Sequence, residues 1–135
     1  MRASRLFESA CAAGDLAGCS HLAPMYEWGE PLGRDLNKAI DLYTKTCDGG
    51  FPRDCHALAK MLLRGGISLR RDPARAIPLL EKACDRDVAV ACRDLASMLE
   101  RGDGITRNPS RARTLMAKAC AGGDKEACAG SRTAR

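Results

Sequence analysis

The chain has 135 residues, a net charge of +5 and 45% hydrophobic residues, which are ordinary values for one folded domain. The charge is spread without a basic block and aromatic residues make up only 4%, so we expect no nucleic-acid partner. No apolar run reaches the roughly 18 residues of a membrane-spanning helix. Alanine and leucine far outnumber valine and isoleucine, which favours helices over strands.

The eight cysteines form four pairs with eight-residue spacing, and the second cysteines of successive pairs lie 36, 37 and 36 residues apart. This regularity indicates a tandem repeat. The pairs are Cys11–Cys19, Cys47–Cys55, Cys84–Cys92 and Cys120–Cys128. Even pairing without a leftover thiol predicts four disulfides and an oxidising compartment. Two alternatives stay open: reduced cysteines as small core residues, and zinc, whose ligand pairs usually stand about two to four residues apart.

In chain order, the first twelve residues align with the second helix of a repeat, because Leu6 and Phe7 match Leu42 and Tyr43. They contain no apolar stretch of signal-peptide length. We therefore expect a preceding first helix and an export signal to lie upstream of this sequence, which would make it a fragment. The expected organisation is one repeat domain over 1–128, with a half repeat at 1–19, repeats at 20–55, 56–92 and 93–128, and a tail or a further helix over 129–135.

Three first helices are predicted at 16–28, 54–64 and 90–101, because apolar columns recur there at offsets of three and four. The core columns are Leu22/Leu58/Leu95, Met25/Met61/Met98 and Tyr26/Leu62/Leu99, with Ala23/Ala59/Ala96 beside them. Gly29, Gly65 and Gly102 are predicted to end these helices. The loops that follow carry one apolar anchor each, which is Leu32, then Ile67 or Leu69, then Ile105.

Three second helices are predicted to begin after the N-cap residues Asp35, Asp72 and Asn108. Their expected buried columns are Ala39/Ala76/Ala112, Leu42/Leu79/Leu115 and Tyr43/Leu80/Met116. The turns that follow should place Gly14, Gly50, Asp87 and Gly123 in the left-handed region, which suits glycine and tolerates aspartate. Pro24 and Pro78 fall inside helices and should bend them.

The sequence carries no recognisable catalytic motif. A Ser-x-x-Lys nucleophile is absent, since Ser20, Ser97 and Ser110 have no lysine three residues on. His21 and His56 stand alone, and the glycine pairs fall in repeat turns. We therefore predict no catalytic residue, no cofactor and no metal.

A binding surface is better motivated, because non-core positions of the first helices vary between repeats and lean basic. The predicted partner-binding residues are Trp28, His56, Lys60, Arg64, Arg93 and Arg101. Such a surface suits a peptide with acidic groups or an exposed carboxylate. The competing interpretations are a solvated helix face, Trp28 packed on the loop of Leu32, and His56 as an ordinary surface histidine.

The columns Leu-Ala-x-x-Met-(Tyr/Leu), then Gly, then Asp/Asn-Pro-x-Arg-Ala and Lys-Ala-Cys-x-x-Gly resemble the Sel-one-like repeat family. The Cys-x7-Cys spacing resembles its cysteine-rich branch, the Helicobacter cysteine-rich protein type. The departures from the pattern are Pro24, Pro78, Thr46 in place of alanine and Asp87 in place of glycine. The resemblance implies an all-α fold, a right-handed α/α solenoid of disulfide-stapled helical hairpins, and adaptor roles in secreted or periplasmic proteins.

Our leading hypothesis is a non-catalytic repeat scaffold that binds a protein or peptide partner on its concave face, in a secreted or periplasmic setting. The resemblance alone supplies an alternative, a penicillin-binding protein with weak β-lactamase activity and a β-lactam as ligand. A mitochondrial relative of the same type, linked to respiratory-complex assembly, implies a third hypothesis, cofactor handling in the mitochondrial intermembrane space with haem as the cofactor to test.

Overall fold

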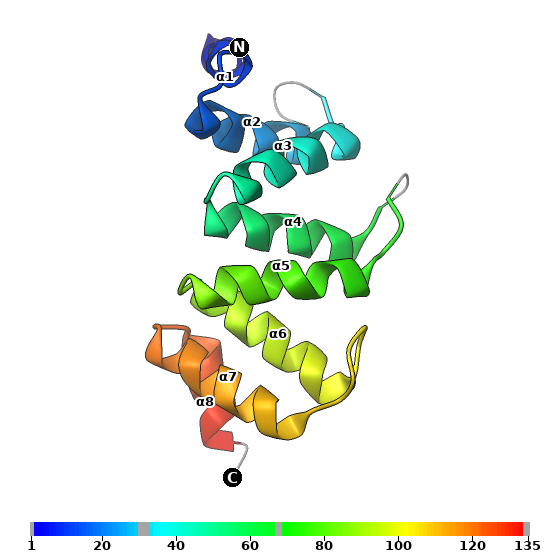
Figure 1. The fold of residues 1–135 in the computed structure, drawn as a ribbon, viewed down its shortest axis with the longest axis vertical. Coiled ribbons are helices and arrows are strands. Elements are labelled where there is room, and N and C mark those ends of the chain that lie inside the picture. Colours follow the sequence, from blue (N-terminus) through cyan, green and yellow to red (C-terminus); the bar gives the residue numbers. More distant parts are fainter. Residues whose placement is uncertain (1, 30–32, 67–68, 134–135) are drawn as a thin grey trace. The chain divides into compact units, whose positions relative to one another are not determined.

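The computed structural model describes residues 2–29, 33–66 and 69–133, and their regular structure is helical. The helices are α1 (Arg2–Ala12), α2 (Leu16–Trp28), α3 (Leu36–Asp48), α4 (Pro52–Arg64), α5 (Pro73–Asp85), α6 (Ala89–Arg101), α7 (Pro109–Ala121) and α8 (Lys125–Thr133) (Figure 1). An isolated backbone pairing between Gly66 and Leu69 lies in the loop after α4, and the described residues contain no strand. The all-α prediction is therefore confirmed.

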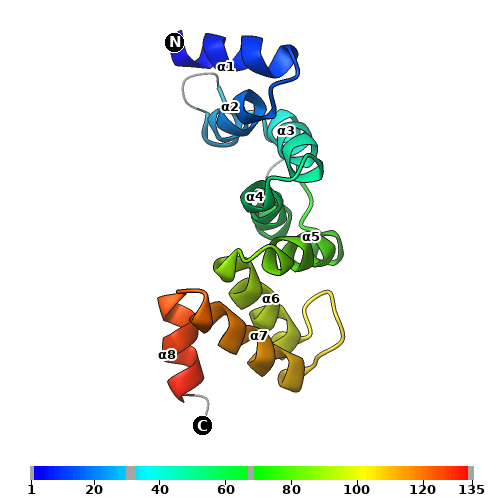
Figure 2. The same cartoon turned by 60° about the vertical axis from the view of Figure 1, so that its left-hand side comes forward.

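The chain divides into two compact units, unit 1 (Met1–Arg71) with α1 to α4 and unit 2 (Asp72–Arg135) with α5 to α8. Inside each unit, every helix packs against the next one along the chain. Figure 2 shows this succession for α2, α3 and α4, and again for α6, α7 and α8. The packing follows from the short connections, because helices joined by a few residues usually become neighbours.

Side-chain caps determine where the second helices begin. Asp35, Asp72 and Asn108 each accept a hydrogen bond of 3.1 Å from the backbone N–H three residues later. The three predicted N-caps are therefore confirmed. Two first helices begin slightly earlier than predicted: α4 at Pro52 and α6 at Ala89. Proline suits the first turn because its fixed φ is helical and its missing N–H would have no helical partner.

The helix ends also follow the sequence pattern. Gly29, Gly65 and Gly102 have φ angles of 83°, 69° and 72°, and their N–H groups donate to the carbonyl four residues earlier. Asp87, with φ of 69°, is the one non-glycine residue with positive φ among those described. It closes the α5–α6 turn, where Gly50 closes the α3–α4 turn with φ of 99°. The left-handed conformations predicted for these turns are confirmed.

The four cysteine pairs are bonded, each at a turn between a second helix and the following first helix. Their Cα–Cα distances are 4.6 or 4.7 Å, inside the range that disulfides require. Cys47 lies near the end of α3 and Cys55 in the first turn of α4, so the turn itself brings them together. The reduced and zinc-bound alternatives do not apply to this structure.

The apolar columns of the first helices form the core. Leu22, Leu58 and Leu95 are buried, as are the alanine column and the column that begins with Tyr26. Met61 and Met98 are buried as well, whereas Met25 is only half-buried.

One predicted column of the second helices is wrong. Leu42, Leu79 and Leu115 are half-buried, and so is Met116, while Ile40 and Ile77 are buried in their place. The reason is helical geometry: Ile40 and Tyr43 lie three residues apart on one face, and Leu42 falls to the side of it.

Pro24 and Pro78 lie inside α2 and α5, and both helices continue through them. The bends expected at these prolines stay a prediction. Among the loop anchors, Leu69 and Ile105 are half-buried, while Leu32 and Ile67 lie outside the described residues.

Candidate functional site

Unit 1 contains a group of buried polar side chains on three consecutive helices. Glu27 on α2, Thr46 on α3 and His56 on α4 are 6%, 0% and 8% exposed. Within the described part of unit 2, no polar side chain is buried to this degree. Burying polar groups costs free energy unless they find partners, so the contacts of this group identify what it does.

Glu27 is the centre of a hydrogen-bond network that joins the three helices. The Tyr43 hydroxyl donates to Glu27 Oε1 at 2.8 Å, and Arg64 Nη2 donates to Glu27 Oε2 at 2.9 Å. Both carboxylate oxygens therefore have a donor, one from α3 and one from α4. The arrangement compensates a buried charge and fixes the position of the Arg64 guanidinium relative to α2.

Tyr43 serves this network as a permanent donor. Burial raises the pKa of Tyr43 above its usual value of 10, and the hydrogen bond to Glu27 raises it further. The negative charges of Glu27 and Asp54 act in the same direction, against a smaller opposing effect of Arg64. The phenol therefore stays protonated at any physiological pH and continues to donate to Glu27.

The Arg64 guanidinium also lies over an exposed aromatic ring. Its Cζ is 5.0 Å from the centroid of the Trp28 indole, within the range of a cation–π contact. Trp28 is 62% exposed. Its packing on the loop of Leu32 stays a prediction, because Leu32 lies outside the described residues. The Arg64 side chain is 41% exposed. Since a guanidinium has five N–H groups, donors remain for an acceptor from outside.

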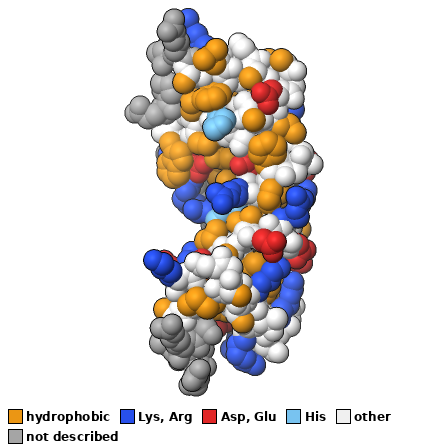
Figure 3. Space-filling model, turned by 90° about the vertical axis from the view of Figure 1, so that its left-hand side faces the viewer, with side chains coloured by type: hydrophobic (Ala, Val, Ile, Leu, Met, Phe, Trp, Pro, Cys, Tyr) orange, Lys and Arg blue, Asp and Glu red, His pale blue; other side chains and the backbone are white. Residues whose placement is uncertain are grey.

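Lys60 adds a second positive charge one turn before Arg64 on α4, and it is exposed. Glu27 offsets the charge of Arg64, so Lys60 contributes a further positive charge beside this ion pair in sequence. Figure 3 shows one face of the molecule, where Lys and Arg side chains stand beside hydrophobic and acidic ones.

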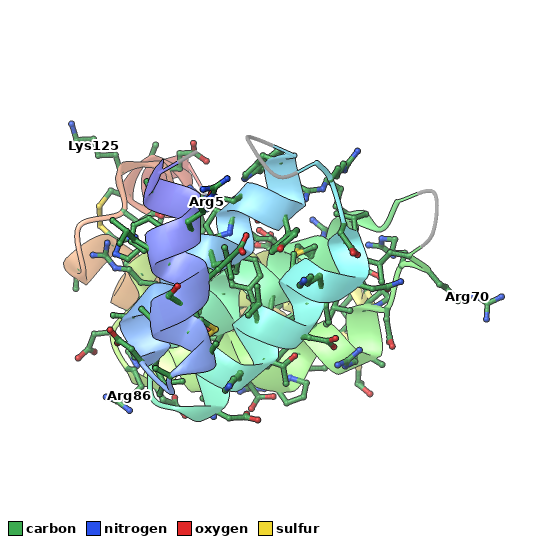
Figure 4. All side chains as sticks on the ribbon, turned by 90° about the horizontal axis from the view of Figure 1, so that it is seen from above. Arg5, Arg70, Arg86 and Lys125 are labelled. Atoms are coloured by element: carbon green, nitrogen blue, oxygen red, sulfur yellow. A yellow bond between two sulfur atoms is a disulfide. The ribbon has the colours of Figure 1, made fainter. Side chains whose placement is uncertain are left out.

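Other basic side chains differ from Arg64 in their surroundings. Arg5, Arg70, Arg86 and Lys125 are exposed, and Figure 4 shows Arg70, Arg86 and Lys125 extending away from the ribbon. The guanidinium of Arg64 is instead restrained by a buried carboxylate and by an indole. A restrained cation loses less conformational entropy when it binds an anion, which makes it the better candidate for recognition.

The remaining predicted residues lie in other environments. His56 is buried, so the interpretation as a surface histidine is wrong. Arg93, on α6, forms ion pairs with Asp124 at 3.2 Å and with Glu126 at 2.8 Å. Asp124 directly precedes α8, and Glu126 lies in its first turn. Arg101 is 3.8 Å from Asp103 and 62% exposed. The structure thus brings Trp28 and Arg64 together in unit 1. Lys60 is exposed on the same helix as Arg64, while Arg93 and Arg101 belong to unit 2.

The sequence did not identify Glu27 and Tyr43 as a functional pair. Glu27 was one more polar position of a first helix, and Tyr43 was one of the core columns. A usable signal existed, because Tyr43 and Thr46 are polar where the α5 residues at the same positions are Leu80 and Ala83. Polar residues in an apolar column mark a place where the repeat departs from its own scaffold.

The described residues contain no group of three His, Cys, Asp or Glu side chains that could hold a metal ion. Among the helices that are described, none is long and apolar enough to span a membrane.

The hairpins and the bonded cysteines define the chain as an all-α repeat protein of the disulfide-stapled α/α-solenoid class. The Sel1 repeat model matches residues 17–51, 52–88 and 89–124, most of the sequence. The chain therefore belongs to the Sel1 repeat family. The predicted family is confirmed, and each match spans one first helix with the second helix that follows.

Solved structures share this fold. A Sel1 repeat protein from Oxalobacter formigenes has a TM-score of 0.84 and 24% identity, covering 98% of this chain and 99% of that one. A protective antigen of uropathogenic Escherichia coli with an SLR fold has a TM-score of 0.86 and 22% identity, covering 95% and 27%. Helicobacter pylori cysteine rich protein B has a TM-score of 0.72 and 23% identity, covering 95% and 91%.

A human protein named cytochrome c oxidase assembly factor 7 is 38% identical over 72 residues. The match covers 47% of this chain and 30% of the human protein's length. None of these similarities supports the alternative of β-lactam binding and hydrolysis.

Proposed function

We propose that the protein is a non-catalytic scaffold that binds a protein or peptide partner, with Arg64 and Trp28 receiving a carboxylate of that partner. Membership of the Sel1 repeat family supports the scaffold role. The observation that carries the site is the Arg64 guanidinium, held by buried Glu27 on one side and by the exposed Trp28 ring on the other.

A carboxylate is the ligand that this geometry favours. The planar guanidinium presents paired N–H donors that match the two oxygens of a carboxylate, and Lys60 supplies the net positive charge. The exposed Trp28 ring offers an apolar surface for the residue that bears the carboxylate, and exposed tryptophans are frequent energetic centres of interfaces. Binding on the concave face stays a proposal, and the Arg64 site includes neither Arg93 and Arg101, which belong to unit 2, nor His56, which is buried.

The four disulfides indicate an oxidising compartment. We propose secretion or the periplasm, as the cysteine-rich pattern suggests. Similarity to a cytochrome c oxidase assembly factor supports the alternative, an adaptor in the mitochondrial intermembrane space. Fractionation of the source cells would separate the two, because the protein would co-purify either with the envelope and medium or with mitochondria.

The site can be tested with an unbiased peptide library. Random hexapeptides with free C-terminal carboxylates and the same peptides with C-terminal amides are passed over immobilised full-length protein, and retained peptides are identified by mass spectrometry. We expect retention of free-carboxylate peptides, or of amidated peptides rich in Asp and Glu if a side chain supplies the carboxylate. The two library forms distinguish these sources.

The matched control uses the same column in unit 2. Arg64→Gln should lower retention about tenfold, since a charge-assisted hydrogen bond is lost, while Arg101→Gln should leave it unchanged. The proposal would be contradicted if Arg64→Gln retained each of the two libraries as well as the unaltered protein does.

A further inference from the structure

One position of the α3–α4 hairpin departs from the other hairpins next to its disulfide. The residues that precede the two cysteines are Ala10 and Gly18, Ala83 and Ala91, or Ala119 and Ala127 in three hairpins. In the α3–α4 hairpin they are Thr46 and Asp54. A small pair is thus replaced by a polar pair in one place only.

The small pair has a clear structural reason. A Cβ added at Gly18 would lie 2.7 Å from the Cβ of Ala10, so the two helices approach closely there. Larger polar side chains at such a contact work against tight packing and gain nothing for the core. Asp54 lies in the first turn of α4, where its negative charge interacts favourably with the helix dipole, and the surroundings of the carboxylate indicate a further role.

The Asp54 carboxylate is only partly compensated. Its Oδ2 atom is buried and has no hydrogen-bond partner. Thr46 does not supply one, because its hydroxyl donates to the backbone carbonyls of its own helix, Leu42 O and Tyr43 O, both at 3.1 Å. Both oxygens of Glu27, by contrast, have donors. Asp54 thus retains an acceptor that lacks a donor.

A pocket of about 410 Å³ lies beside Asp54, which is one of its lining residues. It is lined by Ser20, Gly50, Phe51, Pro52, Arg53 and Asp54. Phe51 and Pro52 make one side apolar, and the exposed Arg53 side chain has access to solvent. The combination of an apolar wall and an unsatisfied carboxylate suits an alkyl chain that ends in a positively charged hydrogen-bond donor.

We propose that this pocket binds a primary ammonium group on an alkyl stem, as in a lysine side chain or a peptide N-terminus. The stem would lie against Phe51 and Pro52, and the ammonium would donate to Asp54 and to the Ser20 hydroxyl. The positive charge of the ammonium would compensate the Asp54 carboxylate, whose Oδ2 atom has no hydrogen-bond donor. No bond is made or broken, so the pocket acts by recognition alone.

The pocket and the carboxylate site face the same way on α2. Ser20 lines the pocket and Glu27 holds Arg64, and residues seven apart share a helix face. Their separation along the helix axis is about 10 Å, the rise of seven residues. An extended peptide covers that distance in about three residues. This step rests on the proposed function: one peptide would place its carboxylate at Arg64 and its ammonium about three residues away.

The pocket is tested first without any peptide. The full-length protein, labelled with ¹⁵N, is titrated with n-butylammonium chloride and separately with n-butanol. We expect saturable shifts of the Phe51, Arg53 and Asp54 amides with the ammonium, and at least about fivefold weaker binding of the alcohol. Asp54→Asn should remove this difference, whereas Asp41→Asn, which changes the net charge equally at an exposed site, should keep it.

Ser20→Leu provides a second variant that fills the pocket while leaving Asp54 in place, and it should weaken both probes. Unaltered far-ultraviolet circular dichroism shows that each variant is folded. Equal binding of the ammonium and the alcohol by the unaltered protein, or an unchanged preference in folded Asp54→Asn, would overturn the proposal.

Peptides then separate this inference from the proposed function. Peptides retained through their carboxylate are compared with versions that carry lysine or acetyl-lysine two, three or four residues from it, and with free or acetylated N-termini. A preference of about tenfold for the free lysine or the free N-terminus, lost in Asp54→Asn, supports the ammonium site and names its source. Carboxylate-dependent retention without any ammonium preference would overturn the inference alone. Loss of the carboxylate dependence would overturn the proposed function instead.

Discussion

Unit 1 and unit 2 are built from the same helical columns but use them differently. In unit 2, two positions of α5 hold the buried apolar residues Leu80 and Ala83. In unit 1, the equivalent positions of Leu80 and Ala83 hold Tyr43 and Thr46. The difference shows that the scaffold tolerates polar residues at these positions without a change in helix length.

The arginines that end two of the first helices also differ between the units. Arg64 ends α4 and Arg101 ends α6, both directly before a C-cap glycine. Arg64 is bonded to a buried glutamate and covered by an indole, while Arg101 lies 3.8 Å from Asp103 and is mostly exposed. The same residue type in the same register is therefore restrained by a carboxylate and an indole in one unit and mostly exposed in the other.

The largest effect we expect is the loss of stability when a disulfide is removed, and this loss should be the same in both units. Replacing both members of Cys47–Cys55, or both members of Cys84–Cys92, with alanine should lower the free energy of unfolding by about 2.5 kcal/mol, since the loops are equal in length. Urea denaturation without reductant measures both variants. Losses that differ by more than 1.5-fold, roughly, would mean that strain or packing outweighs loop entropy in one hairpin.

A smaller effect should separate the units. Glu27→Leu leaves the buried Tyr43 hydroxyl without its acceptor and frees Arg64, so we expect a loss of about 2 kcal/mol. Glu100→Leu, at the equivalent exposed position on α6, should change the free energy of unfolding by about 0.5 kcal/mol or less. Urea titrations of the two variants make the comparison, and similar losses would show that the buried network adds no stability to unit 1.

The smallest effect is a pH dependence that belongs to unit 1. Because the pKa of Tyr43 is raised in the folded state, the folded protein keeps a proton above pH 10 that the unfolded chain loses. The stabilisation that protonated Tyr43 gives the folded state is therefore complete below about pH 10. It declines as the pH rises, by about 1.4 kcal/mol per pH unit. Tyr43→Phe should remove this slope and cost about 1 kcal/mol at neutral pH. The free energies of unfolding of both proteins are measured between pH 9 and 11. The same pH dependence in both would contradict the assignment of this slope to Tyr43.

Much of the fold was predictable because it depends on local rules that repeat. The N-cap role of Asp35, the left-handed Asp87 and the register of Cys47 with Cys55 all follow from neighbours within a few residues. The start of α4 at Pro52 was missed by two residues, because the proline marks a first turn that the apolar pattern does not reveal.

The candidate site was only partly predictable because it depends on contacts between helices. Trp28 and Arg64 were expected on a binding face, but their stacking depends on Glu27, which is distant from Arg64 in sequence. Asp54 departs from the small residues at the equivalent positions, but what this departure means appears only when the pocket and the unpartnered oxygen are seen together. Single-sequence patterns give the positions on a helix, not the partners across it.

The central claim is that Arg64 and Trp28 form a carboxylate site. Trp28 is the single tryptophan of the chain, so its fluorescence reports directly on that site. The most direct measurement is a titration of the full-length protein with N-acetyl-tetraalanine, compared with the same peptide carrying a C-terminal amide. We expect a saturable change of Trp28 emission with the free-carboxylate peptide and no change with the amide at equal concentration. In Arg64→Gln, neither peptide should change the emission. Equal responses to the acid and the amide, or a response that persists in Arg64→Gln, would contradict it.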